Sequence, residues 1–410
     1  MKSDTTLMGC LLLAVAQLAQ AEPPRLSLKG FGTAVAVGSN TDRIGFRRDL
    51  SQEVGARRHG GFDPDSRFGL QLDLDFGDAW HAGIQWVARS HPGDFVEQNL
   101  DWAYLRWRPR PDLDVRLGRL GFDVFWLSDY RNVGYAYPWI RPPHEFYGGI
   151  PAYHFDGADI AKKFGVGDGF LTVKVFGGRA FYQVPAALSQ TFDSVSLLAG
   201  GSIVYEQGDW RARLGYVHTE AQSDPPLQGL VAALHDPRVR LLWPGGVAVA
   251  DRFRVRGTVV QYSSLGLGYD DGSWLAQLEA AYIDSNLPFY PSGANGYLSL
   301  GRRVGPVTLY TLLGIAETFK DPVPVSQPLL PVPALVGFRD TVDAILNGNG
   351  IDQKSISLGV RWDLHENIAL KAQWSHYWLG QNGTQLWQEP FLGSTPREVD
   401  LWSVGVDFLF

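Results

Sequence analysis

The side chains that usually carry catalysis are scattered singly along this 410-residue sequence. The histidines, His81, His218 and His376 among them, lie far apart and show none of the paired Cys and His spacings of zinc sites. Ser375 precedes His376, but adjacent residues of an alternating strand point to opposite faces, so these two cannot act together. The sequence also lacks a Gly-x-Ser-x-Gly elbow and a glycine-rich phosphate loop followed by Lys. We therefore predict no catalytic residues, no bound metal and no cofactor.

One oxygen-rich segment, residues 343–352, could hold a divalent cation. Its Asp and Asn side chains are interspersed with Gly348 and Gly350, and carboxylate and amide oxygens are ligands that Ca²⁺ takes. An Asn-Gly loop tip without metal is the simpler interpretation, because this motif is typical of turns.

Many charged residues alternate with apolar ones, so the two kinds occupy opposite faces of a strand. With the apolar face turned outward, the inward basic positions are Arg67, Arg89, Arg106 and Arg116. A later segment contributes Asp123, Asp129, Arg131, Arg141 and Glu145. Opposed charges across a narrow passage produce a transverse field that filters solutes by charge. The alternative is that these charges pair with one another along the wall and serve only to keep the wall hydrated and folded. Because charges of both signs are present, a preference for anions and a preference for cations both stay open.

Composition excludes several classes of protein. Repeated runs of about 20 apolar residues, which a bundle of transmembrane helices needs, are missing. The chain has 47 Gly, 14 Trp, 16 Tyr and 22 Phe, which indicates many strands and turns and not disorder. Its formal net charge of −7 and the lack of a basic tract argue against nucleic acid as a partner.

Residues 1–21 are expected to be a cleaved signal peptide. Lys2 precedes an apolar stretch, and Ala19-Gln20-Ala21 is a small-x-small cleavage site before Glu22. Cys10 resembles a lipoprotein cleavage site, but the hydrophobic segment before it is too short. The mature chain, residues 22–410, would then be exported without any Cys.

Alternation with a period of two dominates the chain after Glu22. Residues 66–76, 355–363 and 400–410 each place apolar side chains on one face and polar or small ones on the other. About sixteen such segments follow one another, most of them about 9–13 residues long, which is the length of a tilted strand that crosses a bilayer. The sequence therefore predicts an all-β protein.

The connections between these segments alternate in length. Tight turns such as Gly77-Asp78, Gln207-Gly208 and Gly305-Pro306 follow the even-numbered strands. Long segments follow the odd-numbered strands, at about residues 38–65, 120–154, 178–196, 221–255, 318–351 and 379–397, with shorter ones near 91–97 and 285–293. A transmembrane antiparallel β-barrel produces this parity, with short periplasmic turns and long extracellular loops. A large soluble all-β protein is the alternative, although it has no reason to keep the parity.

A sheet with such an apolar outer face must close on itself in lipid, so that no strand edge is left unpaired. Aromatic residues near strand ends, such as Trp107, Trp210 and Trp402, fit an interfacial girdle. A break that suggests a second domain is not evident. Residues 22–410 are therefore expected to form one barrel, and the segment 323–336, rich in Pro, Val and Leu, a rigid cover near its mouth or against a neighbouring subunit.

The mature chain resembles the Gram-negative general porin family over essentially its whole length. Its closing segment, Asp400–Phe410, is similar to the porin terminal strand, and Gly118-Arg119 opens the long segment 120–154. Pro143-His144-Glu145-Phe146-Tyr147-Gly148-Gly149 loosely resembles a stretch of the porin third loop. The resemblance implies an outer-membrane homotrimer with a water-filled pore for small hydrophilic solutes. It also implies that residues 120–154 fold into the lumen as a constriction loop and that the barrel-assembly machinery reads Phe410.

Three functions remain open at this point. The leading hypothesis is a passive diffusion porin without cofactor or energy input. The near rival is a substrate-selective channel in which Tyr135, Tyr137 and Trp139, with nearby Arg side chains, form a binding track for an anion or a sugar. The third hypothesis is a closed barrel that serves as an enzyme or a structural anchor.

Overall fold

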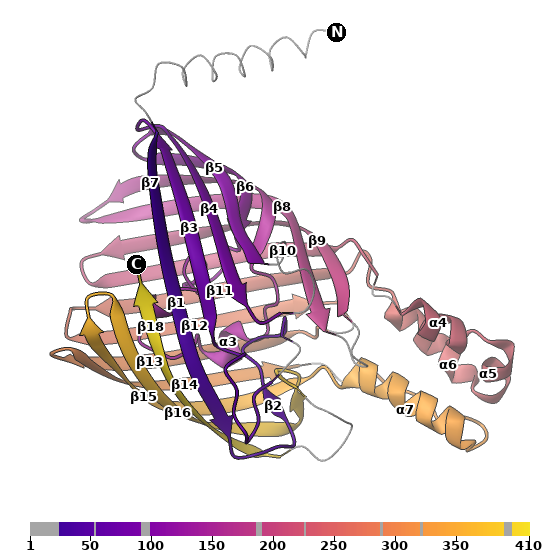
Figure 1. Ribbon diagram of the computed structural model, residues 1–410. Helices are drawn as coiled ribbons and strands as arrows, with labels where there is room; N and C mark the ends of the chain where they lie inside the picture. The colour runs from indigo at the N-terminus through magenta and orange to yellow at the C-terminus, as the bar shows by residue number, and fades with distance from the viewer. Residues whose placement is uncertain are drawn as a thin grey trace, which may run out of the picture.

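The computed structural model describes residues 24–52, 55–91, 99–185, 191–224, 227–287, 290–319, 323–388 and 396–410. These residues form sixteen antiparallel strands in a closed barrel (Figure 1). The barrel strands are β1 (Arg25–Ser39), β3 (Arg67–Phe76), β4 (Trp80–Arg89), β5 (Leu100–Arg110), β6 (Leu113–Gly121), β7 (His154–Val166), β8 (Gly169–Pro185), β9 (Thr191–Gln207), β10 (Trp210–Ala221), β11 (Val259–Asp270), β12 (Trp274–Ser285), β13 (Gly293–Val304), β14 (Val307–Thr318), β15 (Ile351–His365), β16 (Ile368–Thr384) and β18 (Glu398–Leu409). The predicted fold class and number of strands are confirmed, while the predicted signal peptide, residues 1–21, lies outside the described residues.

The barrel closes where its first and last strands meet. β1 pairs with β3 on one side and with β18 on the other. The amide of Phe410 donates to the carbonyl of Gly30 at 3.0 Å, so pairing continues to the last residue. On the outer surface the Phe410 ring stacks on Phe68, with ring centroids 5.9 Å apart. Closure gives every strand two neighbours, as a sheet in lipid requires.

Side chains alternate across the barrel wall as the sequence pattern predicts. Leu358, Trp402 and Val404 are exposed on the outside, whereas Ser357 and Asp407 are buried on the inside. Large apolar residues are exposed on the outer face of strands around the barrel, for example Leu28, Leu117, Val175, Leu214, Leu309 and Val404. This apolar outer face fits a lipid environment.

The connections follow the predicted parity. Short turns join the strands at one end, and five of them place a glycine at positive φ: Gly77, Gly167, Gly208, Gly272 and Gly305. Side chains strain this conformation, so glycine suits these tight turns. The long connections lie at the opposite end. The predicted long connection at residues 178–196 is wrong, because β8 and β9 pair as far as Pro185 and Thr191.

Two of the long connections carry helices that the sequence analysis missed. The connection after β10 contains α4 (Gln228–Leu234), α5 (Pro237–Leu242), α6 (Pro244–Ala250) and η2 (Asp251–Phe253), and the connection after β14 contains α7 (Pro333–Asn347). They pack on each other through residues such as Trp243, Leu335 and Val342, and they project from the long-loop end of the barrel (Figure 1). We call these five helices the helical module.

The helical module changes the interpretation of two predicted segments. Asp343 and Asn347, placed at a loop tip by the sequence, lie on α7, where Arg339 approaches Asp343 and the Asn347 side chain donates to Asp343. The segment 323–336 packs through Val325 against the other helices of the module. Within the described part of the chain, none of the helices is both long and apolar enough to cross a membrane.

The Asp224 carboxylate joins the beginning and the end of the connection after β10. The backbone amides of Val255 and Arg256 donate to the side chain of Asp224, at 2.7 and 2.8 Å. These two amides, that of Arg256 above all, lower the pKa of Asp224. The two ends of this long connection are thus joined before the chain re-enters the barrel.

Close backbone approach at Gly157 allows a test of the barrel wall. A Cβ atom at Gly157 in β7 would lie 2.1 Å from the carbonyl oxygen of Gly177 in β8, whereas a Cβ at Gly165, in the same strand, would meet nothing within 4 Å. We expect Gly157→Val to destabilise the folded barrel by about 1–3 kcal/mol, because backbone cannot move aside as a side chain can. Gly165→Val is the matched control. The temperature at which the folded band on SDS gels is lost should fall for Gly157→Val alone; equal losses would contradict the expectation.

Candidate functional site

The third long connection, residues 122–153, folds into the barrel as predicted. We call it L3; it contains η1 (Gly134–Ala136) and α3 (His144–Tyr147) (Figure 1). In L3 only Asp129 and Ala136 are exposed, and the other residues are buried or half-buried. The predicted boundaries, 120–154, differ slightly because β6 continues to Gly121. A loop buried to this extent is part of the core of the barrel and not a surface connection.

Apolar packing holds one side of L3. Phe125 and Phe146 of L3 pack on Tyr262 of β11 and Tyr297 of β13, with ring centroids 5.4–6.5 Å apart. These rings meet mostly edge to face, an arrangement that adds to the stabilisation from burial. The cluster extends across L3 to the wall strands and forms the main hydrophobic core of the protein.

A buried carboxylate positions the middle of this packing. Glu279 of β12 is 1% exposed and accepts hydrogen bonds from the Trp126 amide, at 2.7 Å, and from the hydroxyls of Tyr147 and Tyr297. Two of these donors belong to L3 and the third to the wall. Since a buried carboxylate must be hydrogen-bonded, Glu279 fixes residues 125–127 against the barrel.

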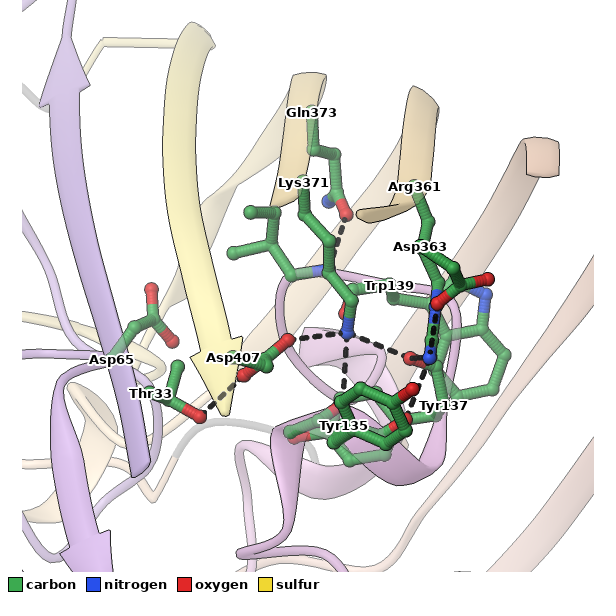
Figure 2. A network of polar contacts seen from close by, with 12 residues as sticks. Thr33, Asp65, Tyr135, Tyr137, Trp139, Arg361, Asp363, Lys371, Gln373 and Asp407 are labelled. Atoms are coloured by element: carbon green, nitrogen blue, oxygen red, sulfur yellow. Dashed lines mark hydrogen bonds and ion pairs between the residues drawn. The ribbon is translucent and has the colours of Figure 1, made fainter. Parts of the chain in front are cut away.

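A buried ammonium holds the second half of L3. The Nζ atom of Lys371 in β16 donates to the carbonyls of Gly134, Tyr137 and Trp139 at 2.7–2.8 Å and pairs with Asp407 at 2.8 Å (Figure 2). Its side chain is 1% exposed. A single charged group therefore donates to three backbone carbonyls of L3 inside the barrel, where such groups need partners.

Arg361 of β15 holds the neighbouring turn. Its guanidinium donates to the carbonyls of Tyr135 and Tyr137, at 2.6 and 3.1 Å, and lies over the Tyr135 ring at 4.6 Å (Figure 2). The Tyr135 hydroxyl donates to the carbonyl of Glu366 at 2.8 Å, and Trp139 Nε1 donates to Ser299 Oγ at 2.8 Å. The three aromatic residues predicted as a binding track are thus anchored to the wall.

The other predicted residues of L3 also face partners. Asp123 pairs with Lys174 and Arg213, each at 2.7 Å. Arg141 pairs with Asp65 at 2.7 Å. Arg131 donates to the Ala152 carbonyl and lies over the Tyr153 ring at 3.4 Å. Glu145 accepts from Gln353 at 2.7 Å, and Asp129 is exposed.

The predicted basic positions lie on adjacent strands but at two heights. Arg67 and Arg89 are directly opposite each other on β3 and β4, and Arg106 and Arg116 are opposite each other on β5 and β6, nearer the short turns. Arg67 donates to the Asn132 carbonyl of L3 at 2.6 Å. The remaining three face carboxylates, in the pairs Arg89–Asp101, Arg106–Asp114 and Arg116–Asp159.

The sequence predicted that acidic residues of L3 would face this basic stripe across the lumen. In the structure most of the carboxylates near the stripe belong to the barrel wall and not to L3. Asp123 turns toward β8 and β10, and Glu145 turns toward β15. Asp129, the third acidic residue of the prediction, does interact electrostatically with Arg116. Wall carboxylates approach Arg89, Arg106 and Arg116. Charges on this part of the wall are thus balanced locally.

Two cavities lie on opposite sides of L3. The larger, about 490 Å³, lies toward the short turns and is lined in part by Trp126, Tyr135, Trp139, Arg303, Arg361 and Asp363. The smaller, about 190 Å³, lies toward the long loops and is lined in part by Phe122, Phe125, Ile150, Val217, Val260 and Tyr262. Phe125 lines one cavity and the next residue, Trp126, lines the other. Residues 125–127 therefore form part of the partition between them.

Sequence reasoning missed the wall residues that fix L3. Glu279 and Lys371 were not singled out, although each lies at an inward position between apolar neighbours. The alternation did place Arg361 and Asp407 on the inner face. All four residues are charged side chains at inward positions of strands whose other face is apolar, and this pattern could have identified them from the sequence. The pattern does not reveal which residue of L3 each of them contacts.

Solved structures share this architecture, whereas no protein-family model matches the chain and no curated protein matches its sequence. The anion-selective porin from Comamonas acidovorans aligns with a TM-score of 0.53 and 15% identity, covering 95% of this chain and 100% of that chain. OmpF of Salmonella typhi, in complex with daunomycin, aligns with a TM-score of 0.53 and 11% identity, covering 94% and 97%. The outer membrane channel DcaP of Acinetobacter baumannii aligns with a TM-score of 0.51 and 11% identity, also covering 94% and 97%.

The chain has the porin fold. In the porin fold the long loops face outside the cell and the short turns face the periplasm. We name the two cavities after these sides of the porin fold: the larger, toward the short turns, is called the periplasmic cavity, and the smaller, toward the long loops, the extracellular cavity. L3 occupies the lumen between them.

Lys371 allows a test of how L3 is held in the porin fold. Lys371→Met removes the cation that pairs with Asp407 and one hydrogen bond from each of three carbonyls, and breaking a buried ion pair costs about 3–5 kcal/mol. We expect L3 to loosen and single-channel conductance in planar bilayers to rise roughly twofold or more. Lys354→Met, at an exposed position of β15, is the matched control. Unchanged conductance in a Lys371→Met protein that still shows the folded gel band would contradict this role.

Proposed function

We propose that this protein is an outer-membrane channel through which small hydrophilic solutes diffuse passively, with L3 as its constriction. The burial of L3 inside a closed barrel is the observation that carries the proposal. The apolar outer face supports a place in lipid, and the solved structures with this fold include proteins named as porins and as an outer membrane channel. The proposal includes no catalytic step and no cofactor.

The packing of L3 favours selective passage over free diffusion. A wide aqueous lumen would leave a constriction loop largely hydrated, whereas here only two residues of L3 are exposed. Tyr135 and Trp139 line the periplasmic cavity beside Arg361, which supports the predicted aromatic track. A general diffusion porin remains the second candidate, favoured by the overall fold.

Further elements of the proposal come from the family resemblance. They are a cleaved leader at residues 1–21, assembly as a homotrimer, and recognition of Phe410 by the barrel-assembly machinery. The position of Phe410 supports the last of these, because its ring is 60% exposed on the outer face while its backbone completes the pairing of β1.

Planar-bilayer recording tests the channel proposal directly. We expect the folded protein to insert with stepwise conductance, and the current to saturate or be blocked by one class of solute. An ohmic current with only mild ion preference would favour the general porin. If the folded protein gave no conductance at all, the channel would have to be abandoned for an enzyme or a structural anchor.

The basic stripe has its own test. Replacing Arg106 and Arg116 by Ser leaves Asp114 and Asp159 without those cations, so the wall becomes more negative there. We expect the reversal potential in a salt gradient to shift toward cation preference. The control is Arg58→Ser, which removes an exposed cation of an extracellular loop. Identical reversal potentials for the double variant and the wild type would exclude the stripe from charge selection.

A further inference from the structure

The extracellular cavity differs from the lumen expected of a porin fold. Water fills the lumen of such barrels, so inward positions are normally polar. Here Val217 of β10 and Val260 of β11 line the cavity from the wall, and Phe122, Phe125 and Ile150 line it from L3. An apolar surface gathered around a cavity in the path of a solute favours a solute with an apolar body.

The size of the cavity sets the size of that body. Its volume is about 190 Å³. An apolar cavity of about 150 Å³ in another protein is large enough to hold benzene. A single substituted aromatic ring therefore fits.

The walls favour an aromatic ring over an aliphatic chain. Phe122, Phe125, Tyr182, Tyr262 and Tyr290 all line the cavity. The rings of Phe125 and Tyr262 are perpendicular, at 88°, with centroids 5.4 Å apart. A ligand ring can add edge-to-face contacts to this cluster, which an aliphatic chain cannot.

A few polar residues line the cavity among the apolar ones. They are Ser194, Ser196, Thr219 and Ser223. The hydroxyl of a serine or threonine can donate one hydrogen bond and accept others. A hydroxyl or carboxylate on the ligand ring would bond to such a group.

The periplasmic cavity suits the same kind of molecule. Trp126, Tyr135 and Trp139 supply aromatic surface there, and Arg303 and Arg361 supply donors for an oxygen substituent. Phe125 lines the first cavity and Trp126 the second, so aromatic surface is present on both sides of L3.

We propose that the channel selects small single-ring aromatic compounds that carry a hydroxyl or carboxylate group, and that the extracellular cavity is their first binding site. This inference rests on the proposed channel function for transport, but binding in the cavity can be measured separately.

The experiment uses the folded full-length protein and 4-hydroxybenzoate as the probe. Acetate, which has the same charge but no ring, and glucose are the comparison solutes. We expect 4-hydroxybenzoate to bind the detergent-solubilised protein in calorimetry and to block bilayer current in a saturable way, and the comparison solutes to do neither. Loss of one hydrogen bond typically weakens affinity about two- to tenfold, so Ser196→Ala, which removes a hydroxyl that lines the cavity, should weaken binding by about that factor.

Ser357→Ala is the matched control, since Ser357 is also a buried inward serine but lines neither cavity. Its affinity should equal that of the wild type. Conductance without binding or block by 4-hydroxybenzoate would overturn the inference and leave the channel in place. Binding without conductance would keep the cavity site and overturn the channel. Equal affinities for the wild type and Ser196→Ala would show that the probe binds elsewhere.

Discussion

Every buried backbone group of L3 needs a hydrogen-bond partner, and this constraint governs the interior of the barrel. A loop at the centre of a barrel cannot use water as freely as a surface loop does. The wall therefore provides charged groups at inward positions, and one ammonium, that of Lys371, takes three carbonyls at once. The carboxylate of Glu279 does the corresponding work for an amide and two hydroxyls. Burying a charged group costs free energy. The burial of both groups therefore fits a loop that must be held in one position.

Charged groups attach L3 to more than one part of the wall. Glu279, Arg361, Lys371 and Asp407 lie on β12, β15, β16 and β18, while the two partners of Asp123, Lys174 and Arg213, lie on β8 and β10. The extracellular cavity lies against β10 and β11 and is lined mainly by apolar side chains. Ion pairs therefore fix L3 even on the side where this apolar cavity lies.

The extracellular loops add a second layer of organisation. Short strands β2 (Gly45–Phe46) and β17 (Trp387–Gln388) pair the first and last long loops above the barrel closure, and their apolar core includes Ile140 of L3. The helical module forms a separate core away from this region. The loops therefore support L3 near β1 and β18, while the module projects outward with its own packing.

The amino-acid sequence by itself determined the barrel. Strands with one apolar face, such as those around Phe68 and Trp402, and connections of alternating length predict an antiparallel sheet in lipid. Such a sheet must close into a barrel because no strand edge can stay unpaired there. That residues 122–153 enter the lumen followed from family resemblance. The partners of L3 were decided only by tertiary structure: Lys371 is 232 residues from Trp139 in sequence, and Glu279 is 153 residues from Trp126. Contacts across such separations depend on the height and direction of each strand around the closed barrel, and local sequence patterns do not encode these. The same holds for the helices after β10 and β14, whose apolar faces are covered by each other and not by the sheet.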